Sequence, residues 1–347
     1  MKKGFDNELY FKEQLRAIKK RRAMFKHKFY LELGGKVVYD GHAKRVLPGY
    51  DPRVKLRILK SIRNYGVIYC VNAKQLQSKQ RLQDTELTYK KQALKEVREL
   101  EKNNLKPEAI IITRFSGEKK AIEFKNFLEK KHYKVLVFFE IKNYFNIKKL
   151  LSEKGYGAQP YFTSKKKMIL VTGTASGSGK MGFILSQLYH EFKKSKLSGY
   201  AKFETFPVWN LPLNHPINLA YEAATADLGD ENKIDALYLR YYGVKAVNYN
   251  RDIHNFKILK TLVKKFALIN NHMRNYHSPT DMGINTISKC IIDEGVVRRA
   301  ALKEIRRRYK IYLREYEKGF EKKKTIERMK KIMKKAGLKI KKRMNMS

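Results

Sequence analysis

Cysteine is scarce in this chain of 347 residues, which contains only two. Cys70 lies in a strand-like run and Cys290 in a helix-like run, and neither has a partner at the spacing of a metal or redox pair. This argues against a disulfide framework and against a cysteine-based metal site. We predict two buried, unreactive thiols in a protein of a reducing compartment.

Long apolar runs are also missing. No stretch approaches the roughly 18 to 20 apolar residues that a membrane-spanning helix needs. Residues 1–22 lack the apolar centre of a signal peptide. Since 43% of the residues are hydrophobic, the chain can still bury a sizeable core. We therefore predict a folded, cytoplasmic protein without a membrane span.

Acidic residues are few: 33 Asp and Glu stand against 77 Lys and Arg, giving a net charge of +44. Such a charge is typical of proteins that bind nucleic acids. However, lysine outnumbers arginine by 56 to 21, whereas specific phosphate and base contacts favour the arginine fork. Solvated helix faces account for much of this charge, and a nucleic-acid-binding surface remains as an alternative.

The order of apolar and amphipathic segments indicates the fold class. Three apolar runs, GVIYCVNA, EAIIITRF and YKVLVFFE, alternate with amphipathic stretches in the first half of the chain, which is typical of a parallel sheet covered by helices on both faces. We predict an α/β protein with a mostly parallel sheet and a mainly helical C-terminal part. The expected parts are an N-terminal α/β domain (1–165), a glycine-loop part (166–250), a helical part (251–316) and a basic tail (317–347).

The basic tail has an amphipathic pattern. Its apolar residues Ile326, Met329, Ile332 and Met333 recur at helical spacing among many lysines. We expect a frayed, solvated terminal helix. Docking of this helix on an acidic partner or on a membrane surface is the alternative.

One stretch, MILVTGTASGSGKMGF (168–183), has the pattern of a buried strand, a glycine-rich loop and a helix that begins with a lysine. Glycines let successive backbone N–H groups converge on an anion, and the helix N-terminus and the lysine add positive charge. We predict a site for a phosphate or a nucleotide formed by Gly177, Ser178, Gly179 and Lys180. The N–H groups of Ser178 and Gly179 would form the cradle.

The stretch departs from the P-loop pattern G-x-x-x-x-G-K-[ST] at two positions. Thr174 stands where the first glycine is required, and Met181 replaces the hydroxyl that holds magnesium. These departures weaken the case for hydrolysis of a nucleotide but leave an anion site intact. A glycine turn that only packs the strand against the helix is the alternative.

Other polar residues lie in loops of the kind that carry ligand contacts. Glu204 stands at the end of a predicted strand, and Asn210 and His215 follow in a proline-rich loop. Arg251 precedes a predicted helix, where it could hold a phosphate or carboxylate in a fork, and we expect Asp252 to cap that helix. Ordinary loop hydrogen bonding is the alternative for each.

Two further groups complete the candidates. Thr280 and Asp281 stand at a predicted helix start, where capping explains one of them and an anion would suit both. Lys36, His42 and Arg45 in the N-terminal part are candidates for a second phosphate contact. A purely structural histidine is the alternative for His42.

Five long motifs carry a resemblance to a known family. They are YLELGGKVVYDGHAKRVLPGYDP, SGSGKMGFILSQLYHE, GYAKFETFPVWNLPLNHPINLAYEAATADL, VNYNRDI and SPTDMGIN. In this order, from about Phe5 to about Tyr312, they resemble the bacterial family called domain of unknown function 1846. The resemblance implies a cytoplasmic bacterial protein of mixed α/β build, with no agreed activity.

Some members of that family carry the label of an ATP-dependent zinc protease, which these residues do not support. The zinc motif H-E-x-x-H needs two histidines one helical turn apart. His190 and Glu191 are present, but Lys194 stands at the place of the second histidine. We therefore expect no zinc and no metal site.

Two departures from the family pattern matter for function. Relatives usually have a proline-rich form of the glycine loop, and they usually carry a further C-terminal region. A truncated member that has lost a site is therefore an alternative.

Our prediction is an uncharacterised cytoplasmic bacterial protein that binds a phosphate-bearing small molecule or nucleotide at loop 173–180. If it is an enzyme, we expect group transfer on a phosphorylated metabolite. One alternative is a nucleic-acid-binding or ribosome-associated protein that uses its basic surface. The other is a vestigial or structural member without activity. The sequence leaves the oligomeric state open.

Overall fold

The computed structural model describes residues 2–82, 85–142, 144 and 146–340, so residues 341–347 of the predicted basic tail lie outside the described part. The strands are β1 (Phe29–Leu33), β2 (Tyr65–Asn72), β3 (Ala109–Phe115), β4 (Val135–Phe139), β5 (Met168–Gly173), β6 (Gly199–Phe203), β7 (Asn232–Ile234), β8 (Val247–Tyr249) and β9 (Gly283–Ile284).

The α-helices are α1 (Asn7–Ala23), α2 (Gly41–Val46), α3 (Val54–Lys60), α4 (Ala73–Gln77), α5 (Tyr89–Lys102), α6 (Lys119–Lys130), α7 (Ile147–Leu150), α8 (Lys180–Lys193), α9 (Pro216–Ala224), α10 (Ala236–Tyr242), α11 (Asn250–Phe266), α12 (Glu294–Glu317) and α13 (Lys323–Lys335). Short 3-10 helices are η1 (Tyr156–Ala158), η2 (Ala226–Leu228), η3 (His272–Asn275), η4 (Pro279–Met282) and η5 (Ile287–Cys290).

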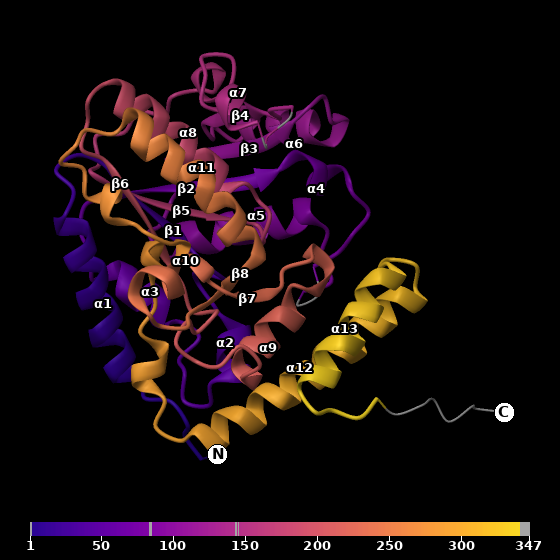
Figure 1. Cartoon of the computed structure of the whole chain (residues 1–347). Helices are drawn as coiled ribbons and strands as arrows, with labels where there is room; N and C mark the ends of the chain where they lie inside the picture. The colour runs from indigo at the N-terminus through magenta and orange to yellow at the C-terminus, as the bar shows by residue number, and fades with distance from the viewer. Residues whose placement is uncertain (1, 83–84, 143, 145, 341–347) are drawn as a thin grey trace.

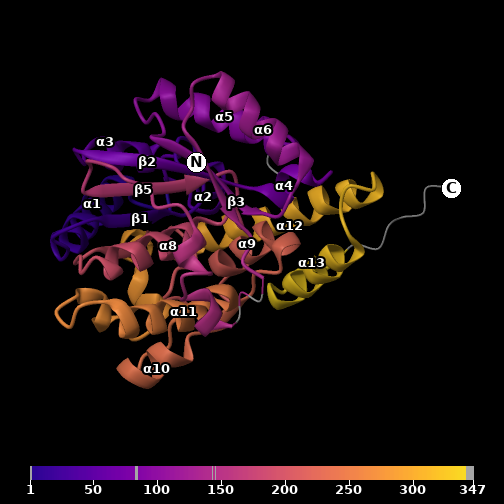
Figure 2. The same cartoon turned by 90° about the horizontal axis from the view of Figure 1, so that it is seen from above.

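A sheet of seven described strands, in the order β4-β3-β2-β5-β1-β6-β9, forms the centre of the molecule. Every neighbouring pair in it is parallel. Helices α5 and α6 cover one face, and α8 and α11 cover the other (Figure 2). Strands β2 and β5 are buried almost throughout, as expected for strands covered on both faces. The predicted parallel α/β sheet is confirmed.

The direction of the strand connections reverses between β2 and β5. From β2 the chain continues through α4 and α5 to β3, toward one edge of the sheet, whereas from β5 it continues through α8 to β6, toward the other edge. β2 and β5 are hydrogen-bonded neighbours. In open α/β sheets, ligands bind outside the carboxyl ends of the strands at such a switch point.

The C-terminal helices pack on one another at one side of the sheet. α12 contacts α9, α2 and α13, and α13 contacts α9 and η2 (Figure 1). The apolar face of α13, which includes Met329, Ile332 and Met333, is buried. The expectation of a frayed, solvated terminal helix is therefore wrong for Lys323–Lys335, because its apolar residues fill a groove beside α9 and α12.

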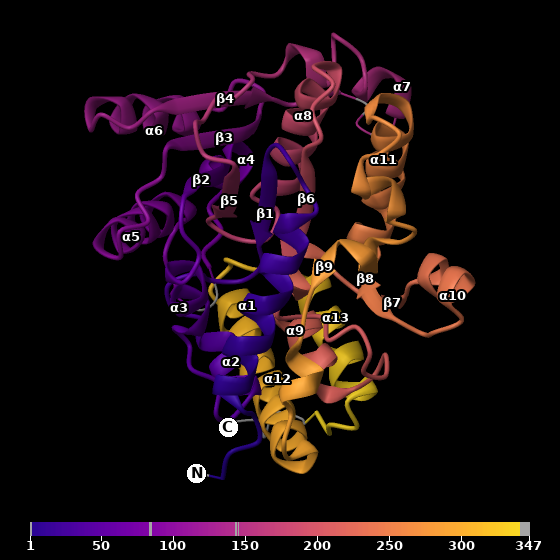
Figure 3. The ribbon, with the colours of Figure 1, turned by 90° about the vertical axis from the view of Figure 1, so that its left-hand side faces the viewer.

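The remaining short elements and the two thiols complete the fold. β7 and β8 form a separate antiparallel pair, and α10 between them extends away from the main body (Figure 3). Cys70 and Cys290 are both free and buried, as predicted. Among the described helices, none combines the length and the apolar character needed to cross a bilayer. The division into four parts stays a prediction.

Candidate functional site

A cleft of about 1460 Å³ lies at the carboxyl ends of the central strands. Its lining includes residues at the ends of β1, β5 and β6, the glycine-rich loop, the first turn of α8 and the start of α11. This is the position that the reversal between β2 and β5 predicts for a ligand. The fold therefore brings together several of the residues that the sequence marked as candidates.

The glycine-rich loop between β5 and α8 needs its glycines. Gly177 and Gly179 have φ values of 76° and 85°, in the left-handed region that glycine adopts without strain. A Cβ at Gly179 would also clash with the Thr113 side chain. Thr113 donates a hydrogen bond from Oγ1 to the carbonyl of Ser178 at 2.8 Å, and Asn72 donates to the carbonyl of Gly177 at 2.9 Å. The loop is thus held by the ends of β2 and β3.

The N-terminus of α8 opens onto the cleft without a cap. Gly179 occupies the N-cap position and no side chain accepts a hydrogen bond from the first turn. The N–H groups at the start of a helix have no acceptor within the helix, so those of Lys180, Met181 and Gly182 are available to an anion. A Cβ built on Gly182 would meet no atom within 4 Å, so there is open space beside this turn, on the side of Gly182.

The cradle differs from the predicted one at Ser178. Its N–H donates to the carbonyl of Ala175 at 3.3 Å, and the residue is fully buried below the loop. The N–H groups that face the cleft are therefore those of the first turn of α8. That these N–H groups hold a phosphate stays a prediction.

Lys180 has a looser ion pair than four other cations near the described part of the cleft. Its Nζ lies 3.8 Å from Glu32 Oε1. The others, in tighter pairs, are Lys36 with Glu96, Lys55 with Asp40 (2.6 Å), Lys202 with Asp252 (2.6 Å) and Arg251 with Asp230 (3.0 Å). The Lys180 side chain is only 12% exposed. A cation that is largely buried and weakly paired favours an incoming anion.

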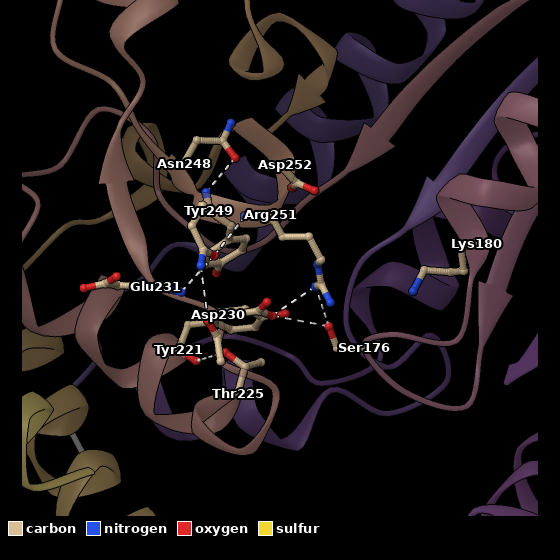
Figure 4. A network of polar contacts seen from close by, with 12 residues as sticks. Ser176, Lys180, Tyr221, Thr225, Asp230, Glu231, Asn248, Tyr249, Arg251 and Asp252 are labelled. Atoms are coloured by element: carbon tan, nitrogen blue, oxygen red, sulfur yellow. Dashed lines mark hydrogen bonds and ion pairs between the residues drawn. The ribbon is translucent and has the colours of Figure 1, made fainter. Parts of the chain in front are cut away.

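Arg251 extends toward the glycine-rich loop from the first turn of α11 (Figure 4). One of its terminal nitrogens donates to Ser176 Oγ at 2.8 Å and to Asp230 Oδ2 at 3.0 Å. The side chain is 40% exposed and lines the cleft. Figure 4 shows Lys180 on the other side of the same space.

Asp252 does not cap α11, which corrects the prediction from sequence. It lies inside the helix, whose N-cap residue is Tyr249, and its carboxylate pairs with Lys202 of β6. Burial by itself would raise the pKa of Asp252, but the charges of Lys202 and Arg251 outweigh this and lower it. Asp252 is therefore an ionised partner of Lys202 in the wall of the cleft.

Glu204, immediately after β6, lines the cleft with a carboxyl group that accepts no hydrogen bond from the described residues. Burial raises the pKa of Glu204 to about 8; the charge of Lys202 opposes the shift and that of Asp252 adds to it. A carboxyl group that titrates near neutral pH in a cleft is suited to proton transfer.

The N-terminal candidates also reach the cleft, but they are occupied. Lys36 donates to the carbonyl of Thr174 at 2.7 Å and pairs with Glu96. Arg45 donates to both carboxylate oxygens of Glu304, at 2.8 and 3.1 Å, and His42 Nδ1 lies 3.3 Å from the same carboxylate. These side chains are engaged with the protein, so their role as a second phosphate contact stays a prediction.

Four predicted contacts lie away from the cleft lining. His215 caps α9 by accepting from the N–H of Ile217 at 3.3 Å, and Asn210 is exposed in the preceding loop. Asp281 forms a capping box with Ser278. Thr280 donates to Asp235 Oδ2 at 2.7 Å. Capping and loop hydrogen bonds, the alternative given above, account for His215, Thr280 and Asp281.

The sequence did not reveal two residues of the cleft lining, Lys202 and Tyr249, nor Asp230, which pairs with Arg251 beside the cleft. Lys202 stands in an otherwise apolar strand, a signal that was available, since a cation there needs a buried partner. Tyr249 lies in the motif VNYNRDI, but no local pattern assigns a role to Tyr249 or Asp230, and only the tertiary fold places them at or beside the cleft. Among the described residues, no group of three His, Cys, Asp or Glu side chains has the geometry to hold a metal ion.

The molecule is thus an α/β protein with a parallel sheet and a polar cleft at its switch point. It belongs to the family described as "Domain of unknown function DUF1846, N-terminal", whose model matches residues 3–337. The resemblance found in the motifs is thereby confirmed.

Curated relatives support the same assignment. A "UPF0371 protein" of Clostridium tetani is 44% identical over 341 residues, and one of Clostridioides difficile is 42% identical over 341 residues. Each alignment covers 98% of this chain and 67% of the relative. The family is bacterial and of unknown function, so the activity has to be argued from the site.

Proposed function

We propose that this protein binds a phosphate-bearing small molecule in the cleft, with the phosphate group against the N-terminus of α8. The observation that carries the proposal is the pairing of an uncapped helix N-terminus with Lys180, whose nearest carboxylate oxygen is 3.8 Å away. Free N–H groups and a helix dipole favour an anion. Lys180 adds a full charge, and Arg251 faces the same space.

The unit resembles a P-loop only in part. A strand, a loop with left-handed glycines and a helix beginning with a lysine follow one another, but Met181 stands where a P-loop has its magnesium-binding hydroxyl. We therefore place the phosphate at the helix terminus and derive no metal-dependent hydrolysis. Group transfer on the bound compound stays a prediction, for which Glu204 is the group placed to move a proton.

The test is a calorimetric titration with inorganic phosphate of the wild type, Lys180→Met and Lys193→Met. Lys193 is the matched control, since it lies at the far end of the same helix with its side chain 49% exposed. A charged hydrogen bond contributes about 1.5 to 3 kcal/mol, so we expect Lys180→Met to weaken binding about tenfold or more. Lys193→Met should bind as the wild type does.

Equal affinities in the two variants, or no binding by the wild type at millimolar phosphate, would contradict the proposal. The fold should survive Lys180→Met because Glu32 keeps the hydrogen bond that it accepts from the Tyr200 hydroxyl at 2.6 Å. A melting curve of each variant checks this.

A further inference from the structure

A group of unsatisfied polar atoms lines the cleft on the side of β6. The Tyr249 hydroxyl and His42 Nε2 are buried without a hydrogen-bond partner, although both residues line the cleft. The carboxyl of Glu204 also accepts no hydrogen bond from the described residues. We call His42, Glu204 and Tyr249 the polar wall.

The members of the polar wall lie side by side. The His42 ring contacts Phe206 and Tyr221, with centroids 5.4 and 5.7 Å apart. Tyr221 stacks on Tyr249 at 5.3 Å. Glu204 is close enough for its charge to raise the pKa of Tyr249. These groups therefore form one surface of the cleft.

Unpaired polar atoms in such a surface point to a hydroxylated ligand. A buried polar group without a partner costs free energy comparable to that of a lost hydrogen bond, and native proteins leave few of them. A hydroxyl both donates and accepts, so a row of hydroxyls could satisfy the Tyr249 hydroxyl, His42 Nε2 and the Glu204 carboxyl together.

The spacing fits a compound that carries both kinds of group. β5 and β6 both pair with β1, and neighbouring strands are about 4.8 Å apart. The residues that follow β5 and β6 are therefore about 10 Å apart across the cleft. A compound whose phosphate lies at the start of α8 would extend its other end toward the polar wall.

This wall does not suit a nucleobase. Tyr221 is stacked between Phe206 at 5.4 Å and Tyr249 at 5.3 Å, so both of its ring faces are covered. The ring of Phe139, which is 58% exposed and could stack on a base, lies at the end of β4, at the opposite edge of the sheet. A nucleotide would have to use that side of the cleft.

We infer that the ligand is a phosphorylated sugar, with its phosphate at the N-terminus of α8 and its hydroxyls hydrogen-bonded to Tyr249 and Glu204. The inference rests on the proposed phosphate site and specifies its substrate class. His42, whose Nδ1 is held by Glu304, offers its Nε2 to the same ligand.

The test compares inorganic phosphate, a panel of hexose and pentose phosphates, and AMP by calorimetry. The variants are Tyr249→Phe, which removes one hydroxyl, and Tyr30→Phe as the control. Tyr30 is also a fully buried tyrosine, but it does not line the cleft. Lys180→Met is included to report on the phosphate site alone.

We expect at least one sugar phosphate to bind more tightly than inorganic phosphate and AMP. Tyr249→Phe should weaken that compound about tenfold, the effect of one lost hydrogen bond to a buried group, and leave inorganic phosphate unchanged. Tyr30→Phe should change neither affinity. Melting curves confirm that both variants fold.

Two outcomes would overturn the inference while the phosphate site stands. In one, no sugar phosphate exceeds inorganic phosphate; in the other, AMP binds most tightly and Tyr249→Phe has no effect. A phosphate affinity that Lys180→Met leaves unchanged would instead overturn the proposed function, and the sugar-phosphate inference with it.

Discussion

Lys55 shows how differently two ion pairs of one short helix contribute to stability. Its Nζ contacts Asp40 Oδ2 and the carbonyl of Gly34, both at 2.6 Å, and both side chains are almost fully buried. Arg57, two residues later in α3, pairs with Glu8 at the surface at 2.7 Å. Removing one partner of a buried pair leaves an uncompensated charge, whereas an exposed pair contributes little.

We predict that Lys55→Met lowers the free energy of unfolding by about 3 to 5 kcal/mol. Arg57→Met should lower it by about 1 kcal/mol at most. Denaturant unfolding of both variants provides the measurement. Similar losses in the two would show that the Lys55–Asp40 pair is not what holds the segment after β1.

Glu204 gives the molecule a specific pH dependence. Its pKa is raised from the ordinary 4.5 to about 8, so the folded state holds a proton that the unfolded state has released between these values. The stability linked to this group is therefore fully present below pH 4.5 and is lost as the pH rises through 8.

We predict that Glu204→Gln, which mimics the protonated carboxyl, unfolds at a higher temperature than the wild type above pH 8. The difference should shrink steadily as the pH falls toward 4.5. Melting curves from pH 4 to pH 9 in phosphate-free buffer would test this. A difference that does not change with pH would contradict a raised pKa.

For single residues, the sequence predicted which polar residues would line the cleft better than it predicted what each residue does. Lys180, Arg251 and Glu204 were candidates and all line the cleft. Asp252 was expected to cap a helix and instead pairs with Lys202. His215 was a candidate ligand and caps α9. A polar residue beside a helix start suits both roles, and only the tertiary contacts decide between them.

The loop and helix after β5 are the elements on which the site depends. The sequence predicted a strand, a glycine turn and a helix in the right order, because a short apolar run and glycine spacing are local signals. It did not predict that Asn72 and Thr113, from two other strands, fix the loop by hydrogen bonds. Contacts of this kind are set by strand order, which no local pattern encodes.

Two glycines of this unit, Gly179 and Gly182, allow a controlled comparison of alanine substitutions. Gly179 combines a φ of 85° with close contact to Thr113, whereas Gly182, in the first turn of α8, has open space around it. We predict that Gly179→Ala destabilises the protein by about 2 kcal/mol or more. Gly182→Ala should be neutral or stabilising by up to about 1 kcal/mol.

Denaturant unfolding measures both free energies. If the two alanine variants were equally stable, the left-handed conformation at Gly179 would not be the native one. The arrangement of the loop over β3 would then have to be different.

For the whole molecule, the large excess of basic residues is the property whose role a local sequence pattern explains least. The sequence left two explanations open, solvated helix faces and a surface for nucleic acid. The structure places some of this charge in intramolecular contacts: Lys335 of α13 pairs with Glu222 at 3.3 Å and with Glu231 at 3.7 Å. The parallel sheet was predictable from the apolar runs. The docking of α13 on α9 was not, because the apolar face of α13, visible in the sequence, does not show which part of the molecule covers it.

Salt dependence separates a phosphate site from a nucleic-acid surface. We predict that phosphate binding in the cleft weakens only modestly between 50 and 200 mM salt, whereas a protein that contacts many backbone phosphates loses about a thousandfold or more over this range. Titrations with inorganic phosphate and with a short RNA provide the comparison. Tight RNA binding that persists in Lys180→Met would favour the basic surface as the functional one.

The most direct test of the central claim is an NMR titration of protein labelled with nitrogen-15 glycine. We predict that inorganic phosphate shifts the amide signals of Gly179 and Gly182 at the start of α8, and leaves those of Gly243 and Gly337, which follow α10 and α13, unchanged. Selective shifts that disappear in Lys180→Met would place the phosphate where we propose it. Shifts spread over glycines of the lysine-rich surface, or none at Gly179 and Gly182, would contradict the account.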